Sequence, residues 1–211
     1  MQLLATTGRR GLVGLVSAAI LIPGSIEFAD RDVATWSHAT LHRPAVFEWL
    51  THIVDPLLPA ATLIVALAGL AALFGWRPGP AARAVLACGI AVLVAVALKD
   101  QLKFAFGRTW PETWVDNNPS WIDTGTFGFW PFHKGPGWAS FPSGHTTVIS
   151  APMAVLWNAA PRFRIVWLAL PLLVAIGLVA SDYHFLGDVI AGAYLGAACG
   201  LGVAALLRRA D

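Results

Sequence analysis

The sequence predicts an all-α integral membrane protein with six transmembrane helices in one bundle. Hydrophobic residues make up 57% of the 211 positions and charged residues 12%, about half the charged fraction of an ordinary soluble domain. The mean hydropathy is +0.66, and the apolar residues gather in runs of about 20, the length at which a helix crosses a bilayer. We therefore expect one membrane-embedded domain over residues 1–211.

Six apolar runs supply the expected spans. In chain order they cover about 11–28, 54–75, 83–106, 144–160, 163–181 and 186–207. Pro23 and Gly24 interrupt the first run, so this helix is predicted to kink or to end early. Because Arg9 and Arg10 precede a short apolar core, residues 1–28 also fit a signal peptide. Either interpretation places residue 30 on the outer side of the membrane.

Two segments outside the spans are expected at the membrane surface. Residues 39–50 are amphipathic and predict an interfacial helix. The connection over 107–142 is rich in Gly, Pro and Trp, and its tryptophans include Trp110, Trp114, Trp121, Trp130 and Trp138. An aromatic belt resting on the membrane surface would explain them. The alternative is that they line a cleft through which a lipid enters.

The charge distribution predicts an orientation. With the N-terminus inside, the inner segments carry Arg9, Arg10, Arg77, Arg83, Arg162, Arg164, Arg208 and Arg209. Nearly all acidic residues then fall outside, whereas Arg31 and Arg43 are exceptions among the cations. Since basic loops mark the cytoplasmic side, both termini are expected in the cytoplasm of a bacterial-type cell, with the protein in its inner membrane. The net charge of +2, without a basic tract, does not indicate a nucleic-acid partner.

Three polar clusters lie at the outer face in this orientation. The third span ends in LKDQLKFAFGRTWP, the fourth begins after FPSGH, and the sixth begins with SDYHFLGDVIAG. Ionisable residues at membrane depth are costly and tend to be functional. Clusters that are distant in sequence but equal in depth therefore predict one site.

The first cluster favours an anion site. Lys99 and Lys103 are four residues apart and share a helix face, and Arg108 follows just past the helix end. Cations that only extend toward the interface are the alternative. Beside two histidines, three cations favour the binding of a phosphate.

The second cluster is typical of the start of a helix that binds an anion. Ser143 is a natural N-cap, and Gly144 lets a ligand approach the backbone. The free N–H groups and positive dipole end of such a helix bind phosphate well. His145 projects from the first turn and is predicted to be an acid or base, with a simple polar cap as the alternative.

The third cluster predicts an activated nucleophile. His184 and Asp188 are four residues apart, so the carboxylate can accept one imidazole N–H and leave the other nitrogen free to attack. A buried pair that only holds a helix in place is the alternative. Together the clusters predict phosphoryl transfer without a metal, because the nearby cations oppose a divalent ion. We find no cofactor-binding motif, and none is expected.

These residues resemble the three motifs of the type 2 phosphatidic acid phosphatase family, which shares its site with the vanadium haloperoxidases. The family's Pro-Ser-Gly-His tetrapeptide is intact at 142–145, and His184, Asp188 and the following VIAG resemble its third motif. Six spans also match, and the resemblance covers about residues 83–207. It implies that His184 is the nucleophile, Asp188 its orienting partner and His145 the general acid and then base.

The resemblance also implies a set of phosphate-binding residues. They are Lys103, Arg108, Ser143 and Gly144, with Lys99 as a further candidate. Two family arginines are absent, because Trp110 stands seven residues after Lys103 and Leu178 stands six before His184. Gly177 replaces a family serine, and Asp182 is an added acid that would repel phosphate if it pointed inward. We expect Arg108, Lys99 or Lys134 to replace the missing cations.

The expected function is hydrolysis of a lipid phosphate or pyrophosphate monoester through a phosphohistidine at the outer membrane face. The resemblance implies a membrane lipid as the substrate. A lipid-to-lipid phosphotransferase of the same fold is one alternative, because access to the cleft selects the acceptor. A non-catalytic lipid-phosphate-binding or transport protein is another. The missing arginines favour binding alone, whereas the lack of repeated halves argues against a transporter.

Overall fold

The computed structural model describes residues 2–114 and 116–209, and this part of the chain is almost entirely helical. It contains no β-strand, only three isolated bridges within the long loop. The all-α prediction is confirmed. Five segments are long and apolar enough to cross a membrane: Gly11–Phe28, Ala45–Leu73, Pro80–Phe106, Pro161–Ala180 and Leu186–Leu207.

The helices follow the predicted order with different bounds. The α-helices are α1 (Gln2–Phe28), α2 (Asp30–Leu41), α3 (Ala45–Thr51), α4 (Leu57–Leu73), α5 (Pro80–Phe106), α6 (Trp121–Thr124), α7 (Gly144–Ala159), α8 (Arg164–Ala180) and α9 (Leu186–Arg209). Three short 3-10 turns are η1 (His52–Val54), η2 (Pro136–Trp138) and η3 (Pro161–Phe163). The helix α1 continues through Pro23 to Phe28 and so does not end early.

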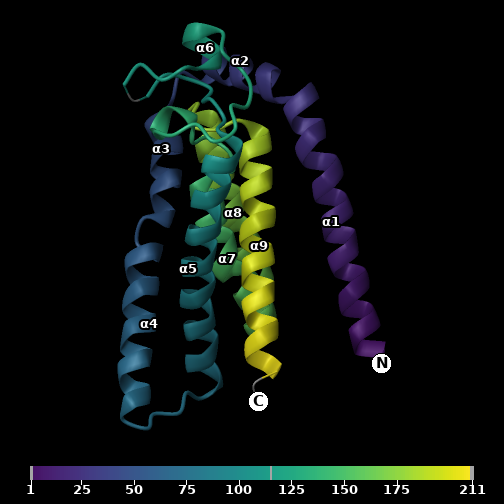
Figure 1. Cartoon of the computed structure of the whole chain (residues 1–211), viewed down its shortest axis with the longest axis vertical. Helices are drawn as coiled ribbons and strands as arrows, with labels where there is room; N and C mark the ends of the chain where they lie inside the picture. Colours follow the sequence, from purple (N-terminus) through teal and green to yellow (C-terminus); the bar gives the residue numbers. More distant parts are fainter. Residues whose placement is uncertain (1, 115, 210–211) are drawn as a thin grey trace.

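The long helices run up and down side by side, and the loops that follow α5 and α8 lie at one end (Figure 1). The N-terminal end of α1, the C-terminal end of α9 and the α4–α5 connection all lie at the opposite end (Figure 1). The helix α1 leans away from the bundle toward its N-terminal end (Figure 1). The C-terminal end of α5 and the first turns of α7 and α9 therefore share one end of the molecule, as the three polar clusters require.

The helix α7 is the expected fourth span, and it differs from the others in length and burial. Its 16 residues rise about 24 Å, less than the ~30 Å hydrocarbon thickness, so it is not among the five candidate spans. It packs against α5, α8 and α9, and residues 146–153 are all buried. The short helix is thus surrounded by protein at the centre of the bundle.

Three glycines let α9 approach the backbone of α7. A Cβ added to Gly192 would lie 2.6 Å from the carbonyl oxygen of Ser143. At Gly196 and Gly200, an added Cβ would overlap the carbonyl oxygens of Thr147 and Ala151. This spacing of small residues is typical of close helix pairs in membranes. It fixes the position of the third polar cluster against the second.

The predicted interfacial helix over 39–50 is wrong, because the chain breaks there. The helix α2 ends at Leu41, and α3 begins only at Ala45. His42 and Arg43 both have a φ of 50°, in the left-handed region, and Pro44 is extended. The helix α3 then leads through η1 into α4, so that Ala45–Leu73 forms one candidate span instead of a surface helix.

Candidate functional site

A cavity of about 580 Å³ opens at the loop end of the bundle, between α4, α5, α7 and α8. All three polar clusters contribute to its wall. Its lining comprises Thr51, His52, Val54, Asp55, Leu58, Lys99, Lys103, Trp110, Trp114, Gly144, His145, Val148, Leu178, Tyr183 and His184. Five of the predicted site residues are among them, namely Lys99, Lys103, Gly144, His145 and His184.

The imidazole of His184 is buried, and the Asp188 carboxylate lies on one side of it. The Nδ1 atom of His184 is 3.3 Å from Oδ2 of Asp188, and the residue is 4% exposed. Because the carboxylate accepts from Nδ1, the Nε2 atom is the one left free. Burial lowers the pKa of His184 below its usual 6.5, while the Asp188 carboxylate opposes that shift. His184 is therefore held as a neutral imidazole with one free nitrogen.

Asp188 is held from several sides. Its Oδ2 atom accepts hydrogen bonds from the Ser140 hydroxyl at 2.6 Å and from the Phe185 N–H at 3.1 Å. Its backbone carbonyl accepts from the Ser143 N–H at 3.0 Å, which ties α9 to the turn before α7. The sequence did not indicate Ser140, because its hydroxyl reaches Asp188 across 48 residues.

The turn before α7 has the predicted cap. The Ser143 hydroxyl accepts from the Thr146 N–H, so Ser143 is the N-cap, but its side chain is fully buried and does not line the cavity. Gly144 faces the cavity, and a Cβ there would lie 3.3 Å from the Lys99 side chain. His145 follows on the cavity wall and is exposed. The first turn of α7 thus presents backbone and imidazole to one space.

Two lysines of α5 supply the positive charge of the cavity. The Nζ atom of Lys103 donates to the carbonyl oxygen of Ala139 and lies 5.5 Å from the centroid of the Trp110 ring. The Nζ atom of Lys99 is 2.5 Å from a carboxylate oxygen of Asp100, which is exposed and does not line the cavity. The two side chains lie one helical turn apart, as predicted.

Arg108 lies outside this cavity, contrary to the arrangement that a phosphate ligand would need. It is 0% exposed, and its guanidinium donates to Asp188 at 2.5 Å and to Asp30 at 2.6 Å. Lys134 also does not line the cavity. Of the three expected replacement cations, only Lys99 is in the cavity wall.

The two positions that lack the family arginines have apolar roles. The Trp110 ring lies against His184, with centroids 5.0 Å apart, and its Nε1 donates to the carbonyl oxygen of Pro136 at 2.8 Å. Leu178 is 1% exposed in the core, and its carbonyl accepts from the His184 N–H. At Gly177 an added Cβ would lie 2.6 Å from the carbonyl oxygen of Phe47, so the packing of α3 leaves no space for a serine there.

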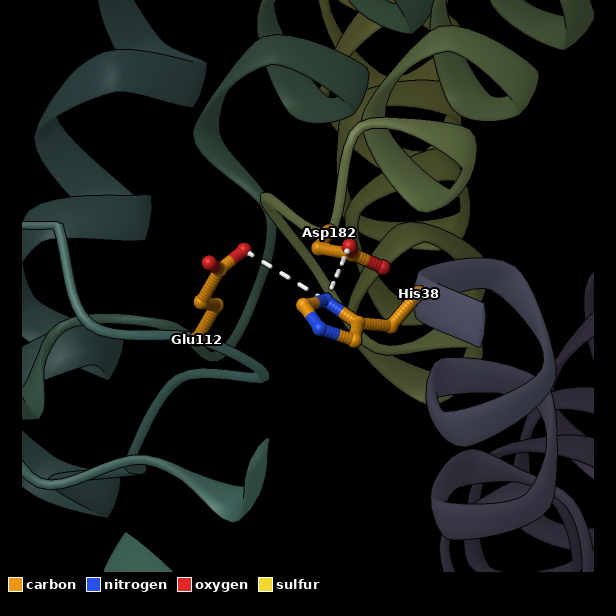
Figure 2. Close-up of side chains that lie close together, drawn as sticks. All are labelled: His38, Glu112 and Asp182. Carbon is orange, nitrogen blue, oxygen red and sulfur yellow. Dashed lines mark hydrogen bonds and ion pairs between the residues drawn. The ribbon is translucent and has the colours of Figure 1, made fainter. Parts of the chain in front are cut away.

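The added acid, Asp182, faces away from the cavity toward α2. Its Oδ2 atom is 3.1 Å from Nδ1 of His38, and that nitrogen is 3.9 Å from Glu112 (Figure 2). The Arg43 guanidinium contacts both Glu112 and Asp182. Burial raises the pKa of Asp182, and His38 and Arg43 oppose that shift. The charge that would repel a phosphate is therefore neutralised outside the cavity.

This cluster also has the spacing of a metal-ligand set. Ligand atoms of His38, Glu112 and Asp182 all lie within 4.8 Å of one another. However, the Arg43 cation contacts the same two carboxylates. Because a cation already lies against both carboxylates, we infer that the cluster joins the α2–α3 connection to the turn before His184.

Comparison with known proteins decides the family. The model of the PAP2 superfamily matches residues 82–210, well over half of the chain. The chain belongs to the PAP2 superfamily. The matched region contains all eight predicted site residues, whereas α1–α4 precede it.

Two curated relatives of this PAP2 protein are lipid A 1-phosphatases. The one from Rhizobium johnstonii is 34% identical over 106 residues, which are 50% of this chain and 41% of the relative. The one from Rhizobium etli is 33% identical over 105 residues, 50% of this chain and 42% of the relative. The chain thus spans only about two fifths of the length of the curated relatives that it matches.

A solved structure shares the fold. It is described as the first transmembrane PAP2 type phosphatidylglycerolphosphate phosphatase, from Bacillus subtilis. The TM-score is 0.54 at 21% identity, and the match covers 95% of this chain and 94% of the other. The PAP2 helix arrangement therefore extends over the described helices that precede the family match as well.

Proposed function

We propose that the protein is a membrane lipid phosphatase that hydrolyses a phosphate or pyrophosphate monoester of a lipid. One observation carries the proposal: His145 and His184 line the same cavity as Lys99 and Lys103, and Asp188 is hydrogen-bonded to His184. These are the parts that metal-independent phosphoryl transfer requires, on a chain of the PAP2 superfamily. We infer that residues 1–211 act as one membrane-embedded domain.

The mechanism follows from the two imidazoles. The free Nε2 atom of His184 attacks phosphorus, and the bond from phosphorus to the lipid oxygen breaks. The protonated ring of His145 gives its proton to that departing oxygen. Neutral His145 then takes a proton from water, whose oxygen attacks the phosphohistidine and releases phosphate and free His184. Asp188 stabilises the charge that forms on His184 during the first step.

Lys103, Lys99 and the backbone at Gly144 are proposed to hold the phosphate oxygens. All three lie in the cavity wall, and the first turn of α7 places a positive helix end beside the two lysines. Ser143 contributes through its cap, which orders that turn. Val54, Leu58 and Val148 line the same cavity and suit the apolar part of a lipid.

The names of the relatives guide the choice of lipids to test. Lipid A carries phosphate on a glycolipid, and the curated relatives are lipid A 1-phosphatases. The solved structure with this fold is a phosphatidylglycerolphosphate phosphatase. Both substrates are membrane lipids with a phosphate monoester, so this class is proposed here.

The proposed location is the inner membrane, with the site at its outer face and both termini cytoplasmic. The positions of the two chain ends, opposite the cavity, support this topology (Figure 1). The inner-side arginines then follow the rule that basic loops stay in the cytoplasm. Substrate is expected to enter laterally from the outer leaflet.

The test is phosphate release by purified protein in detergent, with chelator present. The panel contains lipid A, phosphatidylglycerol phosphate, phosphatidate and an isoprenyl pyrophosphate. Release by the wild type, with none from His184→Ala or His145→Ala, is expected. Release only when an acceptor lipid is added would instead establish a phosphotransferase. Binding without turnover by a folded protein would show that the missing arginines leave a lipid-phosphate-binding protein.

A further inference from the structure

Asp30, at the start of α2, is a fully buried carboxylate that no part of the proposed mechanism uses. Its Oδ2 atom accepts from the Arg108 guanidinium at 2.6 Å. Its Oδ1 atom accepts from the Gly187 N–H at 2.7 Å and from the Ser25 hydroxyl at 3.0 Å. A Cβ at Gly187 would lie 2.9 Å from the Asp30 carboxylate, so only glycine leaves space for this contact. Side-chain or backbone groups of α1, of α9 and of the loop after α5 therefore all bind this one carboxylate.

The guanidinium of Arg108 joins Asp30 to the catalytic pair. Arg108 donates from Nη2 to Asp30 and from Nη1 to Oδ1 of Asp188, at 2.5 Å. The other oxygen of Asp188 faces His184. Four rings surround the guanidinium within 6.0 Å: Phe127, Phe129, Phe141 and Phe185. In such apolar surroundings a shift of one charged group changes the forces on the next, because screening by water is weak.

We propose that Asp30 is a positioning residue that acts on His184 through Arg108. The inference rests on the proposed function, because it assigns His184 as the nucleophile. Asp30 lies outside the stretch that the PAP2 model matches, so the N-terminal helices complete the site instead of only anchoring it. Removing the Asp30 charge leaves the guanidinium bound to Asp188 alone and changes how that carboxylate faces the imidazole.

The first experiment compares Asp30→Asn with Asp32→Asn, an exposed acid in the same first turn of α2. On the best lipid phosphate, Asp30→Asn is expected to lower kcat by about tenfold to a hundredfold, since small misplacements of reacting groups have effects of that order. KM is expected to stay unchanged, because no cavity residue is altered. Asp32→Asn is expected to match the wild type.

A double-mutant cycle tests the route of the effect. If Asp30 acts only through Arg108, the double variant Asp30→Asn/Arg108→Gln is no slower than Arg108→Gln alone. Rates are taken per folded molecule, from the monodisperse fraction that shows a cooperative melt. Additive losses, or an Asp30→Asn enzyme whose kcat per folded molecule stays within twofold of the wild type, would overturn the proposal.

A second readout does not depend on turnover. In protein labelled with ¹⁵N-histidine, the ring signals of His184 are assigned by their loss in His184→Gln. Asp30→Asn is expected to shift these signals, and Asp32→Asn is not. An unchanged His184 signal in folded Asp30→Asn overturns the positioning role. A shifted signal in a protein that hydrolyses no lipid phosphate would preserve that role and refute the proposed function.

Discussion

The Trp110 ring lies against the His184 imidazole, with centroids 5.0 Å apart and planes tilted by 41°. The indole is fixed in this place by its hydrogen bond to Pro136. The family pattern has arginine at this position, and this chain has exchanged it for an apolar ring beside His184. On the proposed function, Lys103, whose Nζ atom is 5.5 Å from the same ring centroid, would carry a larger share of phosphate binding.

Restoring the arginine tests that exchange. In Trp110→Arg we expect inorganic phosphate to bind about tenfold more tightly or better, because a charge-assisted hydrogen bond contributes about 1.5–3 kcal/mol. Calorimetric titration of the detergent-solubilised protein measures this affinity. Trp110→Gln removes the ring without adding a cation, and is expected to stay within threefold of the wild type. Equal affinities of the Arg and Gln variants would contradict the prediction.

His184 is expected to gain its proton at a pH below 6.5. Burial lowers its pKa, so the folded protein binds this proton less readily than the unfolded chain does. The free imidazole should therefore persist as the pH falls from 7.5 to 6.5, and this histidine should cost the folded state stability only as the pH falls below 6.5. Ring-nitrogen NMR signals of His184, followed from pH 8 to 5, measure the protonation. A titration midpoint of His184 at or above pH 6.5 would contradict the expected lowering of its pKa.

The sequence predicted which clusters meet because depth in the membrane follows from counting spans. Lys103, His145 and His184 lie more than 35 residues apart in sequence, yet the alternation of the helices brings them to one cavity. Helix ends were predicted less well, since an apolar run does not show where a chain turns. The break after α2 depends on two residues of positive φ, which composition alone does not reveal.

The environment of each charge could not be predicted. Arg108 was expected to bind phosphate because a cation beside two histidines suits an anion. Its pairing with Asp30 spans 78 residues and depends on how α2 folds over the loop end, which no local pattern records. For the same reason the sequence did not show whether Asp182 points inward, where it would repel phosphate; His38 and Arg43 hold it outside the cavity.

Removing the Arg43 cation should destabilise the protein in a pH-dependent manner. In Arg43→Gln the carboxylates of Glu112 and Asp182 lose a cation that contacts both, and we expect the free energy of unfolding to fall by about 1–3 kcal/mol at pH 8. Burial already raises the pKa of Asp182, so this carboxyl gains its proton above pH 3.8. The stability deficit of Arg43→Gln relative to the wild type should therefore shrink as the pH falls through the raised pKa of Asp182.

Thermal melts of Arg43→Gln and the wild type across pH 8 to 4 measure that deficit. Lys134→Gln removes an exposed cation from the same end of the molecule and serves as the control, with no expected change at any pH. A deficit that stays constant or grows toward pH 4 would show that Arg43 stabilises the fold by packing on Trp114, 4.2 Å from its guanidinium carbon, instead of by charge.

The close pairing of α7 and α9 gives the sharpest prediction about stability. A methyl group at Gly196 would overlap the Thr147 carbonyl, and α7 cannot retreat because α5 and α8 pack on its other sides. We expect Gly196→Ala to lower the free energy of unfolding by about 1–3 kcal/mol, the usual cost of overpacking.

Gly202→Ala is the matched control on the same helix, because nothing lies within 4 Å of its added Cβ. There alanine should leave stability unchanged or raise it by up to about 1 kcal/mol, since it favours the helix over glycine. Thermal melts in one detergent compare the two variants, and equal melting temperatures would show that the helices do not pack on the Gly196 backbone.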